Sequence, residues 1–249
     1  MQGRVALVTG ASRGIGQAIA VAFAEAGGDV AVNYRDDAEG AAETVAAIKQ
    51  RGGKAQAYAA SVANYGEDEK MIANIVRDFG HLDILVNDAG IGTNGSSVAD
   101  GDPNELERVF RVNAMAPYFL AKLAIPHMRS RRRGDIIIVS SAATLKLPPR
   151  TAAYSMSKAA AEALCGVLAK EEREHGIRCN VIGPSLTDTL MARGVVKRLF
   201  GAEDIRDLDA SQPFGHVCRP EEVAAAVVYL ASDANPYVSG QKLYIDGGG

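Results

Sequence analysis

Short apolar runs alternate with longer segments of helical periodicity along the whole chain. About seven runs have the length and composition of strands, and they begin at Val5, Val30, Ala55, Ile84, Ile136, Arg178 and Leu243. Alanine-rich helical patterns separate most of these runs. Strands that alternate with helices pair in parallel through right-handed crossovers, with helices on both faces of the sheet. The pattern therefore predicts an α/β fold over residues 1–249, in one domain, with a doubly wound parallel sheet of about seven strands.

A glycine-rich turn joins the first predicted strand to the first predicted helix. Its glycines have the spacing G-x-x-x-G-x-G, which differs from the usual dinucleotide fingerprint G-x-G-x-x-G. Glycines let the backbone approach a pyrophosphate closely, and the following helix directs its unpaired N–H groups at that charge. The alternative is an ordinary βα turn. We expect cofactor contacts from Gly10, Ser12, Arg13, Gly14, Ile15 and Gly16.

The end of the second predicted strand bears on which dinucleotide binds. An NAD site usually has an acidic residue about 20 residues beyond the glycines, whereas this chain has Tyr34 and Arg35 there. Guanidinium groups from Arg13 and Arg35 would suit the 2′-phosphate of NADP. Asp36 and Asp37 offer an alternative contact to the ribose, and Arg35 has the alternative of a plain surface role. The pattern favours NADP over NAD.

Polar residues that follow the fifth predicted strand suggest acid–base chemistry. Ser140 and Ser141 end the run IIIV, and Tyr154 and Lys158 open the next helical pattern. Residues four apart share a helix face, so these two side chains can enter one cleft. A phenol has a pKa of about 10, and a neighbouring ammonium lowers that pKa. Such a tyrosine can give a proton to a carbonyl oxygen, although this pair alone is also common on helix surfaces.

Two further segments near predicted strand ends carry candidate residues. Residues 87–90, Asn-Asp-Ala-Gly, follow the fourth strand, where open α/β sheets bind ligands; a plain turn is the alternative. Asp102 and Pro103 predict a helix start, with Glu105 closing a capping box. That helix carries Asn113, which is mildly unfavourable inside a helix and either faces solvent or serves a purpose.

Together these motifs resemble the short-chain dehydrogenase/reductase family, with its Rossmann-type fold, over essentially the whole chain. The matching segments are residues 9–16, 87–90 and 220–248. The resemblance implies a catalytic set of Asn113, Ser141, Tyr154 and Lys158. It also implies that Lys158 holds the nicotinamide ribose and that the Asn113 backbone orders a water in a proton relay. Further cofactor contacts are implied for Ser61, Val62, Asn87, Ala89, Gly90, Tyr154, Lys158, Pro184, Ser185, Thr187 and Thr189.

Four positions depart from the residues that this family usually has. Asp88 stands in place of Asn, and Ser61 in place of an Asp that contacts adenine. Ser185 and Cys218 each stand in place of Gly. We expect Ser61 to weaken the adenine contact and Ser185 to alter how the nicotinamide end is held.

Within the family the chain most resembles the 3-oxoacyl-[acyl carrier protein] reductases. The resemblance implies NADPH-dependent reduction of a ketone, such as a 3-oxoacyl thioester or a similar small carbonyl compound, to a secondary alcohol. Tyr154 would be the general acid. One alternative is an NAD(P)-dependent alcohol or sugar dehydrogenase. A second alternative, from a different class, is a dinucleotide-binding sensor without catalysis.

The segment 187–214 is expected to cover the substrate as a lid. Its apolar positions have helical spacing and are Leu190, Met191, Val195, Val196, Leu199 and Phe200. Gly194 and Gly201 would let the segment move. The alternative is a helix that is simply packed on the core.

Composition bears on partners and location. A net charge of -3 and a pI near 5.9 argue against nucleic acid as a partner. The basic run 129–133 is expected to be a solvated helix end. Cys165, Cys179 and Cys218 have no paired spacing, which favours a reducing compartment. With no signal peptide, membrane span or metal-ligand cluster in the pattern, we expect a cytoplasmic protein without metal.

Two helical patterns carry more apolar surface than one sheet face needs. They are the stretch after Lys158 and the stretch 223–230. The family pairs the corresponding elements, which implies a homotetramer or a homodimer. Burial within one subunit is the alternative.

Overall fold

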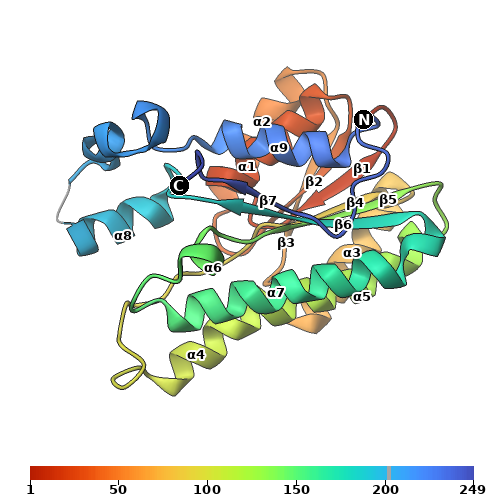
Figure 1. The fold of residues 1–249 in the computed structure, drawn as a ribbon. Coiled ribbons are helices and arrows are strands. Elements are labelled where there is room, and N and C mark those ends of the chain that lie inside the picture. Colours follow the sequence, from red (N-terminus) through yellow and green to blue (C-terminus); the bar gives the residue numbers. More distant parts are fainter. Residues whose placement is uncertain (201–202) are drawn as a thin grey trace.

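A seven-stranded parallel sheet forms the centre of the computed structural model, which describes residues 1–200 and 203–249, without the side chains of residues 198–200 (Figure 1). The strands are β1 (Val5–Val8), β2 (Asp29–Tyr34), β3 (Ala55–Ala59), β4 (Ile84–Asn87), β5 (Gly134–Val139), β6 (Ile177–Pro184) and β7 (Lys242–Ile245). Their order is β3-β2-β1-β4-β5-β6-β7, and every pair is parallel. The order reverses between β1 and β4, as in a doubly wound sheet. The predicted fold class is confirmed.

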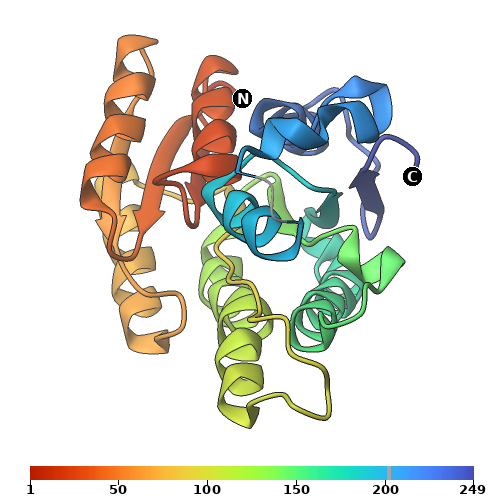
Figure 2. The same ribbon diagram turned by 90° about the vertical axis from the view of Figure 1, so that its left-hand side faces the viewer.

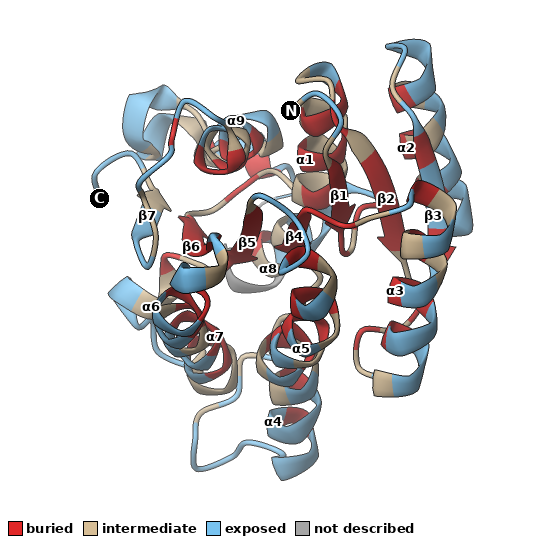
Figure 3. Cartoon of the chain, turned by 90° about the vertical axis from the view of Figure 1, so that its right-hand side faces the viewer, coloured by how far each residue is buried: buried red, intermediate tan, exposed pale blue. Residues whose placement is uncertain are grey.

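Helices cover both faces of this sheet (Figures 1 and 3). One face carries α1 (Gly14–Glu25), α2 (Ala38–Gln50) and α9 (Pro220–Ala231). The other carries α3 (Tyr65–Phe79), α5 (Ala116–Met128) and α7 (Ala152–Glu171), with α4 (Pro103–Phe110) packed against α7. A short helix, α6 (Ala143–Lys146), precedes α7.

Alternate residues of the buried strands supply two separate cores. In β1, Val5 and Leu7 belong to the core under α3, α5 and α7, whereas Ala6 and Val8 belong to the core under α1 and α9. Because both faces are covered, all four residues are buried. This explains why the strands read as continuous apolar runs.

Side chains at the helix starts satisfy N–H groups that a helix leaves unpaired. Asp102 caps α4 by accepting a hydrogen bond from the N–H of Asn104. The predicted capping box with Glu105 is wrong. Glu105 is buried and instead accepts hydrogen bonds from the Thr93 hydroxyl and the Asn94 N–H. The carboxylate therefore holds the loop before α4 rather than the helix start.

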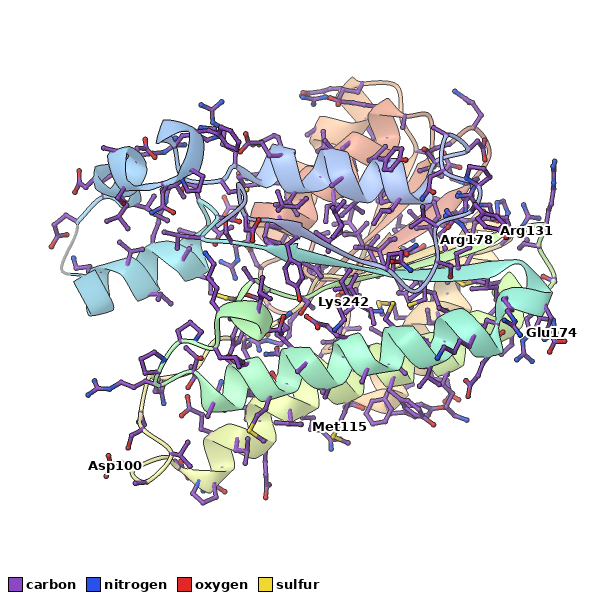
Figure 4. The ribbon with its side chains drawn as sticks, viewed as in Figure 1. Asp100, Met115, Arg131, Glu174, Arg178 and Lys242 are labelled. Atoms are coloured by element: carbon purple, nitrogen blue, oxygen red, sulfur yellow. The ribbon has the colours of Figure 1, made fainter. Side chains whose placement is uncertain are left out.

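The basic run after α5 is only partly a solvated helix end, so that prediction needs correction. Arg133 has a side chain that is only 20% exposed, and it lies 2.9 Å from Asp135 at the start of β5. Arg131 lies 2.8 Å from Asp83, just before β4. Carboxylates at the amino ends of neighbouring strands thus pair with two arginines of the run. These charged residues lie at the amino edge of the sheet together with Arg4 and Arg178. Figure 4 labels Arg131 and Arg178 there, at the end of the sheet away from α8.

The predicted lid contains α8 (Leu190–Phe200) and the 3-10 helix η3 (Ile205–Ser211). Val196, Ile205 and Val217 form a small apolar core of their own there. Gly201 and the side chains of Leu199 and Phe200, which the sequence placed in this lid, lie outside the described residues. All three cysteines are free. Within the described ranges, no helix combines the length and the apolar composition needed to cross a membrane.

Candidate active site

A hollow of about 540 Å³ lies at the carboxyl ends of β1 to β5, beside α7 and the start of α8. We call it the crevice; Figure 2 faces this edge of the sheet, with α8 in front of it. Of the predicted cofactor residues, those that line the crevice are Gly10, Ser12, Arg13, Gly14, Ile15, Tyr34, Arg35, Ser61, Val62, Ala89, Gly90, Tyr154, Lys158 and Thr189. Segments far apart in sequence therefore meet where open α/β sheets bind ligands.

The glycine turn gives the crevice a backbone cradle at the start of α1. Gly10 has a φ of +65°, a conformation that favours glycine. At Gly16, a Cβ would lie 2.6 Å from the carbonyl oxygen of Gly10 and 2.7 Å from a carboxylate oxygen of Asp88. Only glycine fits so close an approach. The cradle at a helix N-terminus fits the pyrophosphate of a dinucleotide.

Tyr154 and Lys158 lie on one face of α7 and both line the crevice. The Lys158 ammonium is 5.9 Å from the centre of the Tyr154 ring. It donates a hydrogen bond of 2.8 Å to the main-chain oxygen of Val139, the last residue of β5. Ser141 lies close enough to the Tyr154 phenol to lower its pKa, and its own oxygen accepts from the N–H of Ala143 at 3.1 Å. Three of the predicted catalytic side chains thus come together.

Asn113 lies in a π-helical turn, η1 (Arg111–Met115), between α4 and α5. It is buried, so the alternative that it faces solvent is wrong. Its amide accepts from the N–H of Ile91 and donates to the Ile91 carbonyl, both at 2.9 Å, and it also donates to Ser157 on α7. Such π-turns are frequent at functional sites. Asn113 fixes the loop after β4 against the helix that carries Tyr154 and Lys158.

Comparisons with known proteins agree with this geometry. A family model described as Enoyl-(Acyl carrier protein) reductase matches residues 10–249. Versicolorin reductase 1 from Aspergillus parasiticus is 40% identical over 256 residues, covering 100% of this chain and 97% of the relative. The chain belongs to the short-chain dehydrogenase/reductase family.

Solved structures of other short-chain dehydrogenases/reductases have the same fold. An NAD+-bound xylitol dehydrogenase has a TM-score of 0.92 at 28% identity, with 99% of this chain and 98% of the other covered. A 3-ketoacyl-(acyl-carrier-protein) reductase from Brucella melitensis, in complex with NADH, has a TM-score of 0.89 at 28% identity, with the same coverage. The chain is thus an NAD(P)-dependent oxidoreductase of this family, and the non-catalytic sensor is set aside.

Burial sets the protonation of the catalytic groups in this short-chain dehydrogenase/reductase. It raises the pKa of Tyr154; the hydrogen bond with Ser141 opposes the rise, and the Asp88 charge adds to it. The expectation that Lys158 brings this pKa below its usual value is therefore wrong for this structure. Burial also lowers the pKa of Lys158 to about 8, against the opposing charges of Asp88 and Glu162. It raises the pKa of Asp88 to about 7, which Lys158 and the Gly16 N–H oppose.

The end of the crevice between β2 and β3 carries the residues predicted to select the cofactor. Asp37 caps α2, accepting from the N–H of Gly40 at 3.1 Å. The hydrogen bond from Gly40 and the Ser12 hydroxyl lower the pKa of Asp37, and a guanidinium nitrogen of Arg13 lies 3.7 Å from its carboxylate. Arg35 pairs with Asp36, and both side chains are largely exposed. Asp37 is thus engaged by the protein itself, and it lines the crevice together with Asp36, Arg13 and Arg35.

Several predicted site residues are not among those that line the crevice. They are Gly16, Asn87, Asn113, Ser141, Pro184, Ser185 and Thr187. Thr187 is buried and donates to the Ser185 carbonyl at 3.0 Å. The amide of Asn87 is buried without a hydrogen-bond partner among the described residues. In those same ranges, no group of His, Cys, Asp or Glu side chains could hold a metal ion.

Two polar residues that support the crevice were missing from the predicted set. Asn33 in β2 accepts from the N–H of Gly10 at 3.3 Å and donates to the Ala60 carbonyl at 3.0 Å. Thr9 accepts from the N–H groups of Asp88 and Ala89, both at 3.0 Å. A polar residue at the end of an otherwise apolar run was the available signal in both cases.

Proposed function

We propose that this protein reduces a ketone to a secondary alcohol with NADPH, in one catalytic domain whose segment 187–214 covers the substrate. One observation carries the proposal: Tyr154 and Lys158 share the crevice with the glycine cradle, and Ser141 lies close enough to the phenol to lower its pKa. A proton donor and a dinucleotide cradle in one hollow are what carbonyl reduction needs.

In the proposed reaction, NADPH held by the glycine cradle and Lys158 would supply the hydride for carbonyl reduction. Tyr154 donates its proton to the carbonyl oxygen, and burial keeps the phenol in the protonated form that this step requires. Ser141 donates to the same oxygen, since the Ala143 N–H already occupies an acceptor site of its hydroxyl. Lys158 holds the nicotinamide ribose. The backbone of Asn113 orders the water through which the phenol regains its proton.

The preference for NADP rests on the far end of the crevice. Arg13 and Arg35 place two guanidinium groups there, which match phosphate oxygens. The carboxylate that would otherwise bind ribose hydroxyls, Asp37, is committed to capping α2. We propose the other contacts that the sequence predicts, with Ser12, Ile15, Ser61 and Val62 toward the nucleotide.

The substrate is proposed to be a 3-oxoacyl thioester or a similar small ketone. Leu190 and Met191 of α8 line the crevice with apolar side chains, which suits a carbonyl compound with an apolar chain. A relative named as a versicolorin reductase and one named as a ketoacyl reductase support reduction. An alcohol or sugar dehydrogenase is the second candidate, favoured by the likeness to xylitol dehydrogenase.

We also propose a homotetramer or a homodimer. Val167 on α7 and Tyr229 on α9 are each about half exposed despite being apolar or aromatic, and they lie on the two helices with surplus apolar surface. Size-exclusion chromatography with light scattering tests this, and a monomer would contradict it. The three free thiols support a reducing, cytoplasmic location.

A substrate panel tests the proposed function. Purified protein is assayed with 3-oxoacyl thioesters, simple ketones and diketones in one direction, and with alcohols and sugars in the other, using NADPH and NADH in parallel. We expect the highest kcat/KM for a ketone with NADPH. Turnover confined to sugars or alcohols with NAD+ would contradict the proposal and support the second candidate.

A further inference from the structure

A buried carboxylate lies on α7 four residues beyond Lys158. Glu162 is only 4% exposed. Its Oε1 accepts hydrogen bonds from the Ser140 and Thr144 hydroxyls, both at 2.6 Å, and its Oε2 accepts from the Lys242 ammonium, also at 2.6 Å. Bonds of this length to a carboxylate are strong. Tyr154, Lys158 and Glu162 are spaced four apart, so they follow one face of the helix.

Both hydroxyls that Glu162 binds flank Ser141. Ser140 precedes it directly, and the Thr144 hydroxyl also lies 2.9 Å from the main-chain oxygen of Ser141. The Thr144 hydroxyl has a single proton, so it donates either to Glu162 or to the main-chain oxygen of Ser141 at any one time. The Tyr244 hydroxyl, 3.2 Å away, can donate to Thr144. The backbone on each side of Ser141 is therefore tied to one carboxylate.

Lys242 brings a counter-charge to Glu162 from the last strand of the sheet. Figure 4 shows Lys242 on the side of the sheet that faces α7. The pair lets a charged group remain buried beside the crevice, because a buried carboxylate needs both a partner charge and satisfied hydrogen bonds. The titratable groups around the pair are Lys158 and Cys165 on α7 and Tyr244 on β7.

We propose that Glu162 is a positioning residue for ketone reduction: through Ser140 and Thr144 it holds the Ser141 hydroxyl in register with the Tyr154 phenol. This inference rests on the proposed function. Glu162 touches neither substrate nor cofactor, and it does not line the crevice. Its negative charge also raises the pKa of Lys158, against the effect of burial.

The test is steady-state kinetics of Glu162→Gln over pH 5 to 10, with the best ketone from the substrate panel and NADPH. The amide keeps the shape but turns an NH2 group toward Lys242. We expect kcat to fall about 10-fold or more, because small displacements of reacting groups are costly, while KM for NADPH stays within about 2-fold. The alkaline limb of the pH profile moves to lower pH, since Lys158 loses a neighbouring negative charge.

Two more variants keep the test decisive if Glu162→Gln folds poorly. Thr144→Val removes one hydroxyl from the network and is expected to lower kcat, whereas Thr144→Ser restores it. Glu174→Gln is the matched control, because Glu174 is an exposed glutamate beyond the end of α7 whose only described ion pair is with His175 (Figure 4).

The outcomes separate this inference from the proposed function. If Glu162→Gln and Thr144→Val keep the wild-type kcat and pH profile while Tyr154→Phe is inactive, Glu162 is only structural and the inference is overturned. If these two variants are less stable than the wild type but have unchanged kinetics, the inference is likewise overturned. If the wild-type protein reduces no ketone, the proposed function itself fails. Lowered kcat with rescue by Thr144→Ser supports the inference.

Discussion

At the amino edge of the sheet, Asp135 is completely buried against three guanidinium groups, whereas at the carboxyl edge Lys158 and Asp88 line an open crevice. Arg4 and Arg133 lie 2.7 and 2.9 Å from Asp135, and Arg178 contacts it from β6. The Arg178 guanidinium also donates to the carbonyls of Leu230 and Val238. This edge uses charge to join strands to the C-terminal segment.

The carboxyl edge directs its polar groups at the crevice. Among the described residues, Lys158 donates one hydrogen bond, to Val139, and the Ser141 side chain lies close enough to the Tyr154 phenol to lower its pKa. Burial shifts the pKa values of Tyr154, Lys158 and Asp88 here. Buried charge alone therefore does not mark a functional site. The distinguishing features are incomplete pairing and a hollow large enough for a ligand.

Removing charge at the carboxyl edge is expected to reduce activity and leave folding intact. Lys158→Met loses the ammonium proposed to hold the nicotinamide ribose, so we expect kcat/KM for NADPH-dependent reduction to fall roughly 100- to 1,000-fold. Thermal unfolding is measured on the same sample. Lys170→Met, an exposed lysine on the same helix, is the control. Full activity of Lys158→Met would remove this residue from the site.

Removing charge at the amino edge is expected to have the opposite signature. Asp135→Asn removes the buried counter-charge of Arg4, Arg133 and Arg178, whose side chains are 14%, 20% and 10% exposed, although Arg133 still pairs with Asp233. The free energy of unfolding should therefore fall by about 3–5 kcal/mol. Below the unfolding temperature, kcat should stay unchanged. Urea unfolding and kinetics measure the two quantities. Asp233→Asn, whose carboxylate pairs with Arg133 but is 89% exposed, should change neither. A large loss of kcat in folded Asp135→Asn would contradict the view that the amino edge contributes to stability and not to activity.

The far end of the crevice offers a test of cofactor choice. Arg35→Ala is expected to lower kcat/KM for NADPH about 10- to 100-fold, because a charge-assisted contact to phosphate is lost. NADH should be affected no more than about 2-fold. Arg77→Ala removes an exposed arginine that likewise pairs with the next residue, Asp78, and should affect neither cofactor. Equal losses with both cofactors would argue against 2′-phosphate recognition.

Another buried carboxylate, Asp68 in α3, belongs to neither edge. Its oxygens have no hydrogen-bond partner among the described residues, and burial, with a contribution from Glu67, raises its pKa to about 8. The unfolded chain has a pKa of about 3.9, so the folded protein binds an extra proton between these values. Stability should therefore fall as pH rises from about 4 to about 8.

Asp68→Asn should remove this dependence. We expect it to stabilise the protein by about 1–2 kcal/mol at pH 8 and by less at pH 5. Thermal unfolding across this pH range measures the difference, with Glu69→Gln on the exposed side of the same helix as control. If the Tm difference between Asp68→Asn and the wild type does not grow with pH, burial does not destabilise the ionised form of Asp68.

The fold followed from the sequence because the central strands β1, β4, β5 and β6 are buried on both faces and the helices between strands are long. Tyr154 and Lys158 were brought together by helical spacing, which is a local property. The role of Glu105 and the pairing of Arg133 were not predicted, because their partners include the loop at residues 93–94 and the segment 231–235, which helix or strand spacing does not relate to them. Asn33 and Glu162 were missed for the same reason: a polar residue in an apolar pattern signals a buried network, but spacing alone does not name its partners.

The central claim is that Tyr154 delivers the proton at the carboxyl edge. The most direct measurement is ketone reduction by Tyr154→Phe at saturating NADPH, together with NADPH binding followed by nicotinamide fluorescence. We predict that turnover falls about 1,000-fold or more, while NADPH binds within about 2-fold of wild type and the unfolding temperature is unchanged. Turnover close to that of the wild type would contradict the account, because the phenol would then take no part in the chemistry.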